Sequence, residues 1–446
     1  MNQNGQLQKT LTLPQVVFLG LAWNTPMIYF SVFGVAYSGS NGFLTSAYFL
    51  AVLAVLFTGA SYAVMAKKIP ISGSAYTFAK KAIHPNVGFL VGWVLLLNYL
   101  FAPIIAAITF GTFMHAEFPA VPSFVWIIGL IVLLAVIASA GVNSSANISS
   151  FFVMLQIIFI IGFTAFLAYA LATGGGAAAL LSPAPFLDVD LNLSVALAGA
   201  SVVVFSFLGF DTMTTLSEET KNATRTIPKA IFIMIAVVGV LHVTMSYFIE
   251  LSYPGFTIQN PDSAALELMG LVGGSVLRAL FMTVLIAAIF TQGLASITSV
   301  SRLMFVMGRD AILPKKVFSY VHPRFHTPVL NIGIASVLSL AAIFITVDDA
   351  IRFVNFGALS AFFFVNLCVI SLYFKNGSPK TIRSTITNLI SPFIGAGFII
   401  WLIALLDVPT LIGGAIWIAG GGLYLLYLTS AFQRPLPDYN AEQKTA

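Results

Sequence analysis

The stretch Ser206-Phe207-Leu208-Gly209-Phe210-Asp211 decides the fold of this chain. It lies inside an apolar run of membrane-spanning length, residues 192–216, where a glycine interrupts the run and a carboxylate follows two residues later. Backbone groups freed inside a bilayer must face protein or a water-filled cavity. An ionisable residue at that depth indicates a functional site. The stretch therefore predicts a polar binding site inside a membrane protein.

Composition places the rest of the chain in the lipid bilayer as well. Of its 446 residues, 59% are hydrophobic and 8% are charged, whereas soluble proteins carry about 25% charged residues. A spanning helix needs about 20 apolar residues, and charged residues are absent from blocks of that length or longer. We predict an all-α integral membrane protein with no soluble domain. The twelve spans expected are residues 13–37, 44–66, 87–114, 124–141, 151–171, 193–216, 230–251, 276–307, 329–345, 351–374, 386–406 and 412–431.

Basic residues set the expected orientation. With twelve spans, the basic loops 67–81, 221–229, 309–324 and 375–383 all fall on one side. The positive-inside rule then puts this side and both termini in the cytoplasm. Because the net charge of +5 belongs to loops beside spans, it does not predict nucleic-acid binding. The single cysteine, Cys368, lies within a span, so we expect neither a disulfide framework nor a metal site.

A second interrupted span strengthens the prediction of a site. The first span contains Ala22-Trp23-Asn24-Thr25-Pro26-Met27, in which proline removes a backbone donor. Taken by itself, this segment is explained equally well by a simple proline kink. The sixth span, however, comes five spans after the first, so a repeated five-helix unit must be inverted in the membrane. Paired broken helices at matching positions of inverted repeats are typical of a transporter site.

The chemistry of two such breaks suits a small zwitterion or amine. The N-terminus of a half-helix attracts a carboxylate. Freed carbonyl groups at the other half-helix attract an ammonium group or a cation. We therefore expect an amino acid or an amine as the ligand, with the bilayer as the surrounding medium.

Several motifs carry a family resemblance. They are Phe205 together with the stretch Ser206 to Asp211 quoted above, Ser217-Glu218-Glu219-Thr220, Ile227-Pro228-Lys229-Ala230-Ile231, Pro70-Ile71-Ser72-Gly73-Ser74-Ala75-Tyr76, the segment 301–314 and His322-Pro323-Arg324. Together they resemble the amino acid–polyamine–organocation (APC) superfamily over essentially the whole chain. Residues 206–220, 320–323 and 354–359 look like those of its bacterial putrescine importers.

The resemblance implies a leucine-transporter-like fold in one transmembrane domain, residues 1–446. Helices 1–5 (13–171) would form the first repeat, helices 6–10 (193–374) the inverted second repeat, and 386–431 two C-terminal helices. It also implies alternating access and proton-coupled uptake at the inner membrane of a bacterium. In this family pattern Phe205 would cover the substrate, and Asp211 would sense protons or pair with an amine.

The expected substrate-binding residues lie at the two breaks and in the middle of helix three. They are Ala22, Trp23, Asn24, Thr25, Pro26, Met27, Asn98, Tyr99, Phe205, Ser206, Phe207, Leu208, Gly209 and Asp211. The Asn98 amide must be satisfied, which favours an inward orientation. Glu218, Glu219 and Arg302 are expected to form a gating ion-pair network. His242 is expected to be packed or hydrogen-bonded rather than to relay protons.

The charge count bears on the substrate. Putrescine importers tend to carry acids where this chain has Ser31 and Asn98, and a buried dication needs a counter-charge at both ends. Asp211 is the one obvious acid at membrane depth, which favours a monoamine or a neutral amino acid over putrescine. Some family members have a lysine that substitutes for sodium where this chain has Gln156, so proton and sodium coupling both stay open. No cofactor is expected beyond such a gradient.

Other functions fit the sequence less well. A putrescine importer and an exchanger are alternatives within the transporter class, and the oligomeric state is undetermined. An ion channel would need a ring of like residues or a filter-like repeat. An enzyme would need paired catalytic groups inside the spans. Neither pattern occurs in the sequence.

Overall fold

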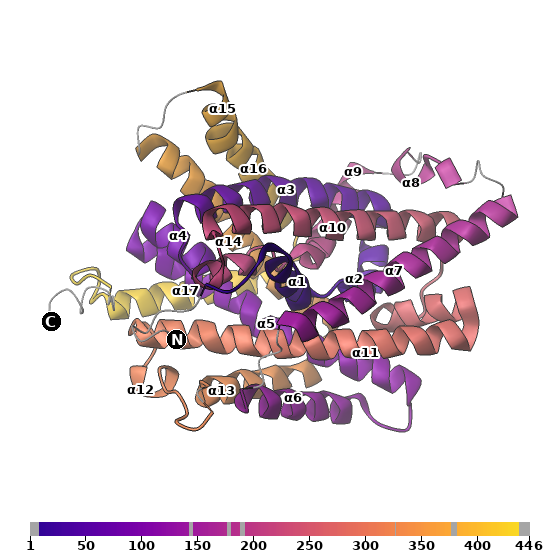
Figure 1. The fold of residues 1–446 in the computed structure, drawn as a ribbon, viewed down its shortest axis with the longest axis horizontal. Helices are drawn as coiled ribbons and strands as arrows, with labels where there is room; N and C mark the ends of the chain where they lie inside the picture. Colours follow the sequence, from indigo (N-terminus) through magenta and orange to yellow (C-terminus); the bar gives the residue numbers. More distant parts are fainter. Residues whose placement is uncertain are drawn as a thin grey trace.

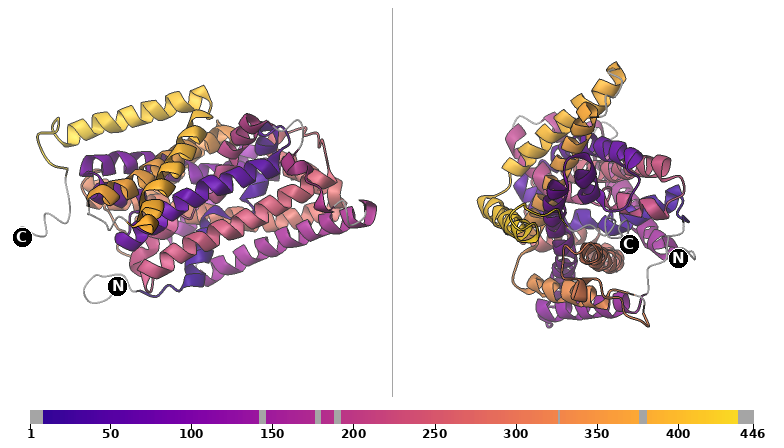
Figure 2. Two further views of the ribbon diagram at one scale, coloured as in Figure 1. Left: turned by 90° about the horizontal axis from the view of Figure 1, so that it is seen from above. Right: turned by 90° about the vertical axis from the view of Figure 1, so that its left-hand side faces the viewer.

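The computed structural model describes residues 9–141, 146–175, 180–187, 192–325, 327–375 and 381–436. Within these ranges the chain is helical, and the only β-type pairing is a single bridge between Leu11 and Thr220. The long helices run side by side along the longest axis of the molecule (Figure 1), as the turned views also show (Figure 2). The all-α prediction is confirmed for the described residues.

Helices cover each of the twelve predicted spans. In the first half they are α1 (Leu13–Asn24), α2 (Ile28–Gly39), α3 (Leu44–Lys68), α5 (Pro85–Glu117), α6 (Ser123–Ser139) and α7 (Ala146–Gly175). In the second half they are α9 (Leu193–Val203), η2 (Val204–Phe207), η3 (Thr212–Glu219), α10 (Ala223–Ser252), α11 (Ala264–Arg309), α13 (Val329–Ser339), η5 (Leu340–Ile343), α14 (Val347–Lys375), α16 (Ser391–Ala404) and α17 (Val408–Leu428). Shorter helices connect them: α4 (Ser74–Ala82), α8 (Ala184–Leu187), η4 (Pro261–Ser263), α12 (Lys315–Phe318), α15 (Ile382–Thr385) and the π-helical η6 (Ile386–Ile390).

Length decides how many of these helices cross a membrane. Among the described residues, nine are long and apolar enough, and the bent pair α1–α2 makes ten. The remaining two predicted spans correspond to shorter apolar helices, α6 and α13–η5. The 17 residues of α6 extend about 25 Å at about 1.5 Å per residue, less than the hydrocarbon thickness of about 30 Å. The count of twelve and the inverted repeat stay predictions.

The helix α11 differs from its predicted span, which begins at residue 276. It starts at Ala264 and is interrupted by non-helical backbone at Gly273 and Gly274, where the φ of Gly274 is +60°. The added turns carry Glu267, so they do not form part of an uncharged run in the sequence. The interruption separates them from the long apolar part of α11.

The broken first span lies in the middle of the bundle (Figure 1). Together, α1 and α2 pack against α7, α9, α10 and α11, and α1 also contacts η3. Because these neighbours surround both half-helices, Met27 and Tyr29 have no exposed surface. Large apolar side chains on outer helices, such as Val136 and Ile416, are exposed instead, as expected for a surface that faces lipid.

Hydrogen bonds join the ends of several helices beside the basic loops. Lys375 Nζ donates to the Ala82 carbonyl oxygen at the end of α4, 3.1 Å away. The backbone N–H of Lys221 donates to the carbonyl of Leu11. Tyr424 in α17 donates to the carbonyl of Ile312, just after α11. We call this end of the molecule, where α3, η3, α11 and α14 end, the basic end.

Candidate functional site

The first span breaks where the sequence predicts. The helix α1 ends at Asn24, α2 begins at Ile28, and the two are bent by 49°. Proline has no N–H to donate, and Thr25 has a φ of 33°, outside the helical region. Two side chains bind the backbone freed here. His242 Nε2 lies 3.1 Å from the Pro26 carbonyl oxygen, and the N–H of Met27 donates to Gln156 Oε1 at 3.4 Å.

The sixth span breaks between η2 and η3. Gly209 has a φ of +107°, and a Cβ there would lie 2.8 Å from the carbonyl oxygen of Gly20. Only glycine suits both conditions. The Gly209 N–H donates to Asp211 Oδ1 at 3.1 Å, so the carboxylate caps the break in its own helix.

A side chain joins the two breaks directly. Asn24 Nδ2 donates to the carbonyl oxygen of Phe205 over 3.0 Å, across 181 residues of sequence. With the contacts of His242, Gln156 and Asp211, this hydrogen bond means that backbone groups freed at both breaks bond to side chains of the protein. We expected these groups to attract the ligand themselves. In this structure the side-chain atoms left unbonded are the better candidates.

Unbonded polar atoms gather around the breaks. Buried side-chain atoms without a hydrogen-bond partner among the described residues include Trp23 Nε1, Asn24 Oδ1, Asn98 Oδ1 and Nδ2, Gln156 Nε2, Asp211 Oδ2 and His242 Nδ1. Each such atom costs about 1–3 kcal/mol, and native proteins contain few of them. Their concentration here indicates a site built to bind a polar molecule.

Asp211 supplies the negative charge of this site. The residue is fully buried, and its Oδ2 has no hydrogen-bond partner in the described chain. Tyr62 and Tyr99 lie close enough to interact electrostatically with it. The Tyr99 ring packs edge-on against Trp23, with centroids 5.7 Å apart. A carboxylate beside aromatic rings suits an organic ammonium group, which gains both charge pairing and cation–π attraction.

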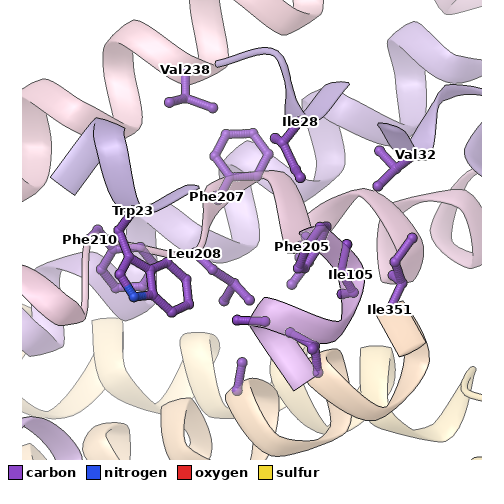
Figure 3. Packing of buried hydrophobic residues seen from close by; sticks show 14 of the residues in the cluster. Trp23, Ile28, Val32, Ile105, Phe205, Phe207, Leu208, Phe210, Val238 and Ile351 are labelled. Atoms are coloured by element: carbon purple, nitrogen blue, oxygen red, sulfur yellow. The ribbon is translucent and has the colours of Figure 1, made fainter. Parts of the chain in front are cut away.

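The apolar residues of the sixth span line several sides of the break. Phe205, Phe207, Leu208 and Phe210 are each at most 1% exposed, and Figure 3 shows them in one packed cluster with Trp23. Their neighbours differ, however. Phe207 contacts the rings of Tyr48 and His242, and Phe210 contacts those of Tyr62 and Phe362. Ser206 bonds to the Tyr48 hydroxyl at 3.1 Å. That Phe205 covers the substrate stays a prediction.

The remaining predicted residues are also buried. Ala22, Thr25 and Met27 are at most 3% exposed, and the Thr25 hydroxyl donates to Gln156 Oε1. Asn98 has no exposed surface. Its backbone lies against α14, where a Cβ on Gly357 would be 2.8 Å from the backbone nitrogen of Asn98. Asn98 is therefore buried rather than exposed to lipid, but its amide has no hydrogen-bond partner among the described residues, and its contact with the substrate stays a prediction.

A second acid, partly buried near the end of a span, was not expected from the sequence. Glu250 near the end of α10 accepts a hydrogen bond of 2.5 Å from the backbone N–H of Thr45, in the first turn of α3. It follows His242 and Ser246 at four-residue spacing, so a helical pattern of polar residues was the available signal. Eight residues along a helix span about 12 Å. Glu250 therefore lies well beyond His242, and Asp211 is the acid at the breaks.

The predicted gating residues are not joined. Glu218 Oε1 accepts from the backbone N–H of Ser72 at 3.2 Å. The carbonyl oxygen of Glu219 accepts from the N–H groups of Thr10 and Leu11. Arg302 is exposed, and no ion pair between it and either glutamate is found among the described residues. A gating role for the three stays a prediction. The described part of the chain also contains no group of three or more potential metal ligands.

Comparison with known proteins identifies the chain. The family model described as amino acid permease matches residues 12–426. The chain belongs to the amino acid permease family. Over 97% of its length the permease is 38% identical to the low-affinity putrescine importer PlaP of Escherichia coli, and the match covers 96% of that protein. The resemblance seen in the sequence is thus confirmed.

Two other relatives differ in their named cargo. The permease is 28% identical to the methylthioribose transporter of Bacillus subtilis, covering 96% of this chain and 95% of the relative. It is 26% identical to the branched-chain amino acid permease BcaP of the same organism, over 86% of this chain and 85% of the relative. With the apolar helices, these matches show a multi-pass membrane transport protein that handles a small molecule.

Proposed function

We propose that this permease imports a small amine or amino acid across a bacterial inner membrane by alternating access. The observation that carries the proposal is the buried carboxylate of Asp211. One of its oxygens caps the break at Gly209, and the other has no partner in the described chain. An ammonium group placed against Oδ2 would satisfy the carboxylate and lie near the aromatic rings of Trp23 and Tyr99.

The number of carboxylates favours a substrate with a single ammonium group. Among the described residues, Asp211 is the only acid at the two breaks, and Glu250 lies too far along α10 to serve the other end of the same small molecule. The unbonded amide of Asn98 would suit a neutral polar group or a carboxylate. Putrescine is the main alternative substrate, because PlaP, the putrescine importer of Escherichia coli, is 38% identical to the permease.

A proton gradient is the driving force we favour. A carboxylate that binds an ammonium group in one step of the transport cycle can carry a proton in another, so Asp211 would serve for both substrate binding and coupling. Sodium coupling and exchange are the alternatives. Neither mechanism needs a cofactor. By the positive-inside rule we assign the basic end and both termini to the cytoplasm.

Uptake into proteoliposomes tests this function. The permease is reconstituted, and monoamines, diamines and neutral amino acids are offered with proton and sodium gradients imposed separately. We expect uptake of a monoamine or an amino acid that follows the proton gradient and is lost in Asp211→Asn. Uptake of diamines alone would contradict the preference for a single ammonium group, and unchanged uptake by Asp211→Asn across pH would contradict the proposed role of Asp211. Uptake that requires substrate inside the liposomes but no ion gradient would identify an exchanger.

A further inference from the structure

The turn before α4 binds the half of the sixth span that leads to the basic end. Ser72 Oγ donates to the carbonyl oxygen of Thr215 at 2.6 Å, and the Ser72 N–H donates to Glu218 Oε1 at 3.2 Å. Ser74 Oγ donates to the carbonyl oxygen of Asp211 itself, at 3.3 Å. Three hydrogen bonds therefore connect this turn to residues 137 to 146 positions away.

The segment that these hydrogen bonds support is intrinsically weak. The helix η3 is a 3₁₀-helix of eight residues, whereas runs longer than about four residues are uncommon because the hydrogen-bond geometry is poorer. Within the described chain, its hydroxyl groups bond to the backbone of the same segment. Thr212 Oγ1 donates to the Gly209 carbonyl at 2.8 Å, and Thr214 Oγ1 to the Asp211 carbonyl at 2.6 Å. A 3₁₀ stretch inside a longer helix often marks a hinge.

The turn itself is rigidly built. Gly73 has a φ of +120°, a conformation that favours glycine. Thr77 Oγ1 donates back to the carbonyl of Ser72 at 3.0 Å. At its other end α4 is anchored to α14, because Ser371 Oγ and Lys375 Nζ both donate to the carbonyl of Ala82. A weak hinge segment is thus fastened to a firm support.

We propose that Ser72 and Ser74 form a latch that holds η3, and with it Asp211, in place while the basic end is closed. Their hydrogen bonds must break when η3 moves to open that end. Both serines are positioning residues, since neither is placed against the substrate, and Ser74 acts through the backbone of Asp211. The role in transport rests on the proposed function, but the latch itself is a property of the empty protein.

Cysteine accessibility tests the latch without any substrate. Met213 in η3 is fully buried, and its side chain lies against Gly20 of α1. In a Cys368→Ala background, Met213→Cys provides a single reporter, labelled with a membrane-impermeant maleimide added at the basic end. The variants compared are Ser72→Ala/Ser74→Ala, the conservative Ser72→Thr, which keeps the hydroxyl at a half-buried position, and the control Ser319→Ala. Ser319 is near the same end, but its hydroxyl bonds to Lys315 and does not contact η3.

The expected result is faster labelling when the hydroxyl groups are lost. Two neutral hydrogen bonds contribute enough for a change of about tenfold in the labelling rate of Ser72→Ala/Ser74→Ala. Ser72→Thr and Ser319→Ala should label at the parent rate. Equal rates in the alanine pair and in Ser319→Ala would overturn the proposal.

A second measurement needs no reporter cysteine. In uptake assays, Ser72→Ala/Ser74→Ala should raise KM and alter the pH profile, because Asp211 is less firmly held, whereas Ser72→Thr should keep both at the wild-type values. A lower maximal rate with unchanged KM and pH profile would indicate a merely structural role and would also overturn the latch. If Asp211→Asn transports normally while labelling still responds, the proposed role of Asp211 fails and the latch stands.

Discussion

Replacing His242 tests how the first break is held together. His242 is fully buried, and its Nε2 lies 3.1 Å from the carbonyl oxygen of Pro26, 216 residues away. A carbonyl can only accept, so Nε2 carries the hydrogen. Nδ1 has no partner among the described residues, which fits a neutral ring. His242→Leu leaves the Pro26 carbonyl buried and unbonded, which costs about 1–3 kcal/mol.

That free energy corresponds to roughly a 5- to 150-fold change in the ratio of folded to unfolded protein. Unfolding of the purified permease in mixed micelles measures it. His242→Gln keeps an N–H donor of similar reach, so it should recover most of the lost stability and leave the pH profile of uptake unchanged. A His242→Leu protein as stable as wild type would refute the hydrogen-bond argument. Loss of pH dependence in His242→Gln would show that His242 relays protons.

Three further outcomes are expected. Gly209→Ala forces an alanine into a φ of +107° and against a neighbouring carbonyl, so it should lower the unfolding free energy by more than about 1 kcal/mol and abolish uptake; wild-type uptake would mean that the break is not strained. Asn98→Asp adds an acid beside the breaks and should shift a competition assay towards diamines, whereas an unchanged profile would refute the charge count. Partial burial raises the pKa of Asp407, but its hydrogen bonds with Thr410 and its contact with Arg352 outweigh this and hold the pKa below 3.8. The resulting stabilisation is therefore present above pH 3.8, is lost as the pH falls below it, and amounts to less than about 1 kcal/mol for this partly exposed pair. Thermal denaturation of the wild type and of Asp407→Asn at pH 7 and pH 3 measures it. The variant should lose less stability than the wild type between the two pH values, and an equal loss in both proteins would contradict this.

Local chemistry made the two breaks predictable. Pro26 and Gly209 act on their own backbone, through a missing donor and a positive φ, so neither effect depends on distant residues. The apolar runs likewise predicted where helices occur, because hydrophobicity over about 20 residues is a property of the sequence alone. Their count as spans depends on exact helix length, which fraying and kinks at glycines such as Gly274 alter.

Contacts between distant residues were not predictable. The hydrogen bonds of Asn24 to Phe205 and of His242 to Pro26 join positions 181 and 216 residues apart, and a single sequence carries no signal for such pairs. Glu250 was not predicted for a different reason. It stands at the end of an uncharged run, and the length of such a run does not show that Glu250 shares a helix face with His242 and Ser246. The helix α4 was missed because it is short and amphipathic rather than apolar.

Binding of an organic ammonium ion to Asp211 is tested most directly by isothermal titration calorimetry on the purified permease. A short aliphatic monoamine, the diamine of the same length and a neutral amino acid are titrated into wild type and Asp211→Asn. Since removing one partner of a buried ion pair costs about 3–5 kcal/mol, the substitution should weaken binding of the preferred ligand by at least about 100-fold. Equal affinity of the two proteins for that ligand would contradict the assignment of Asp211.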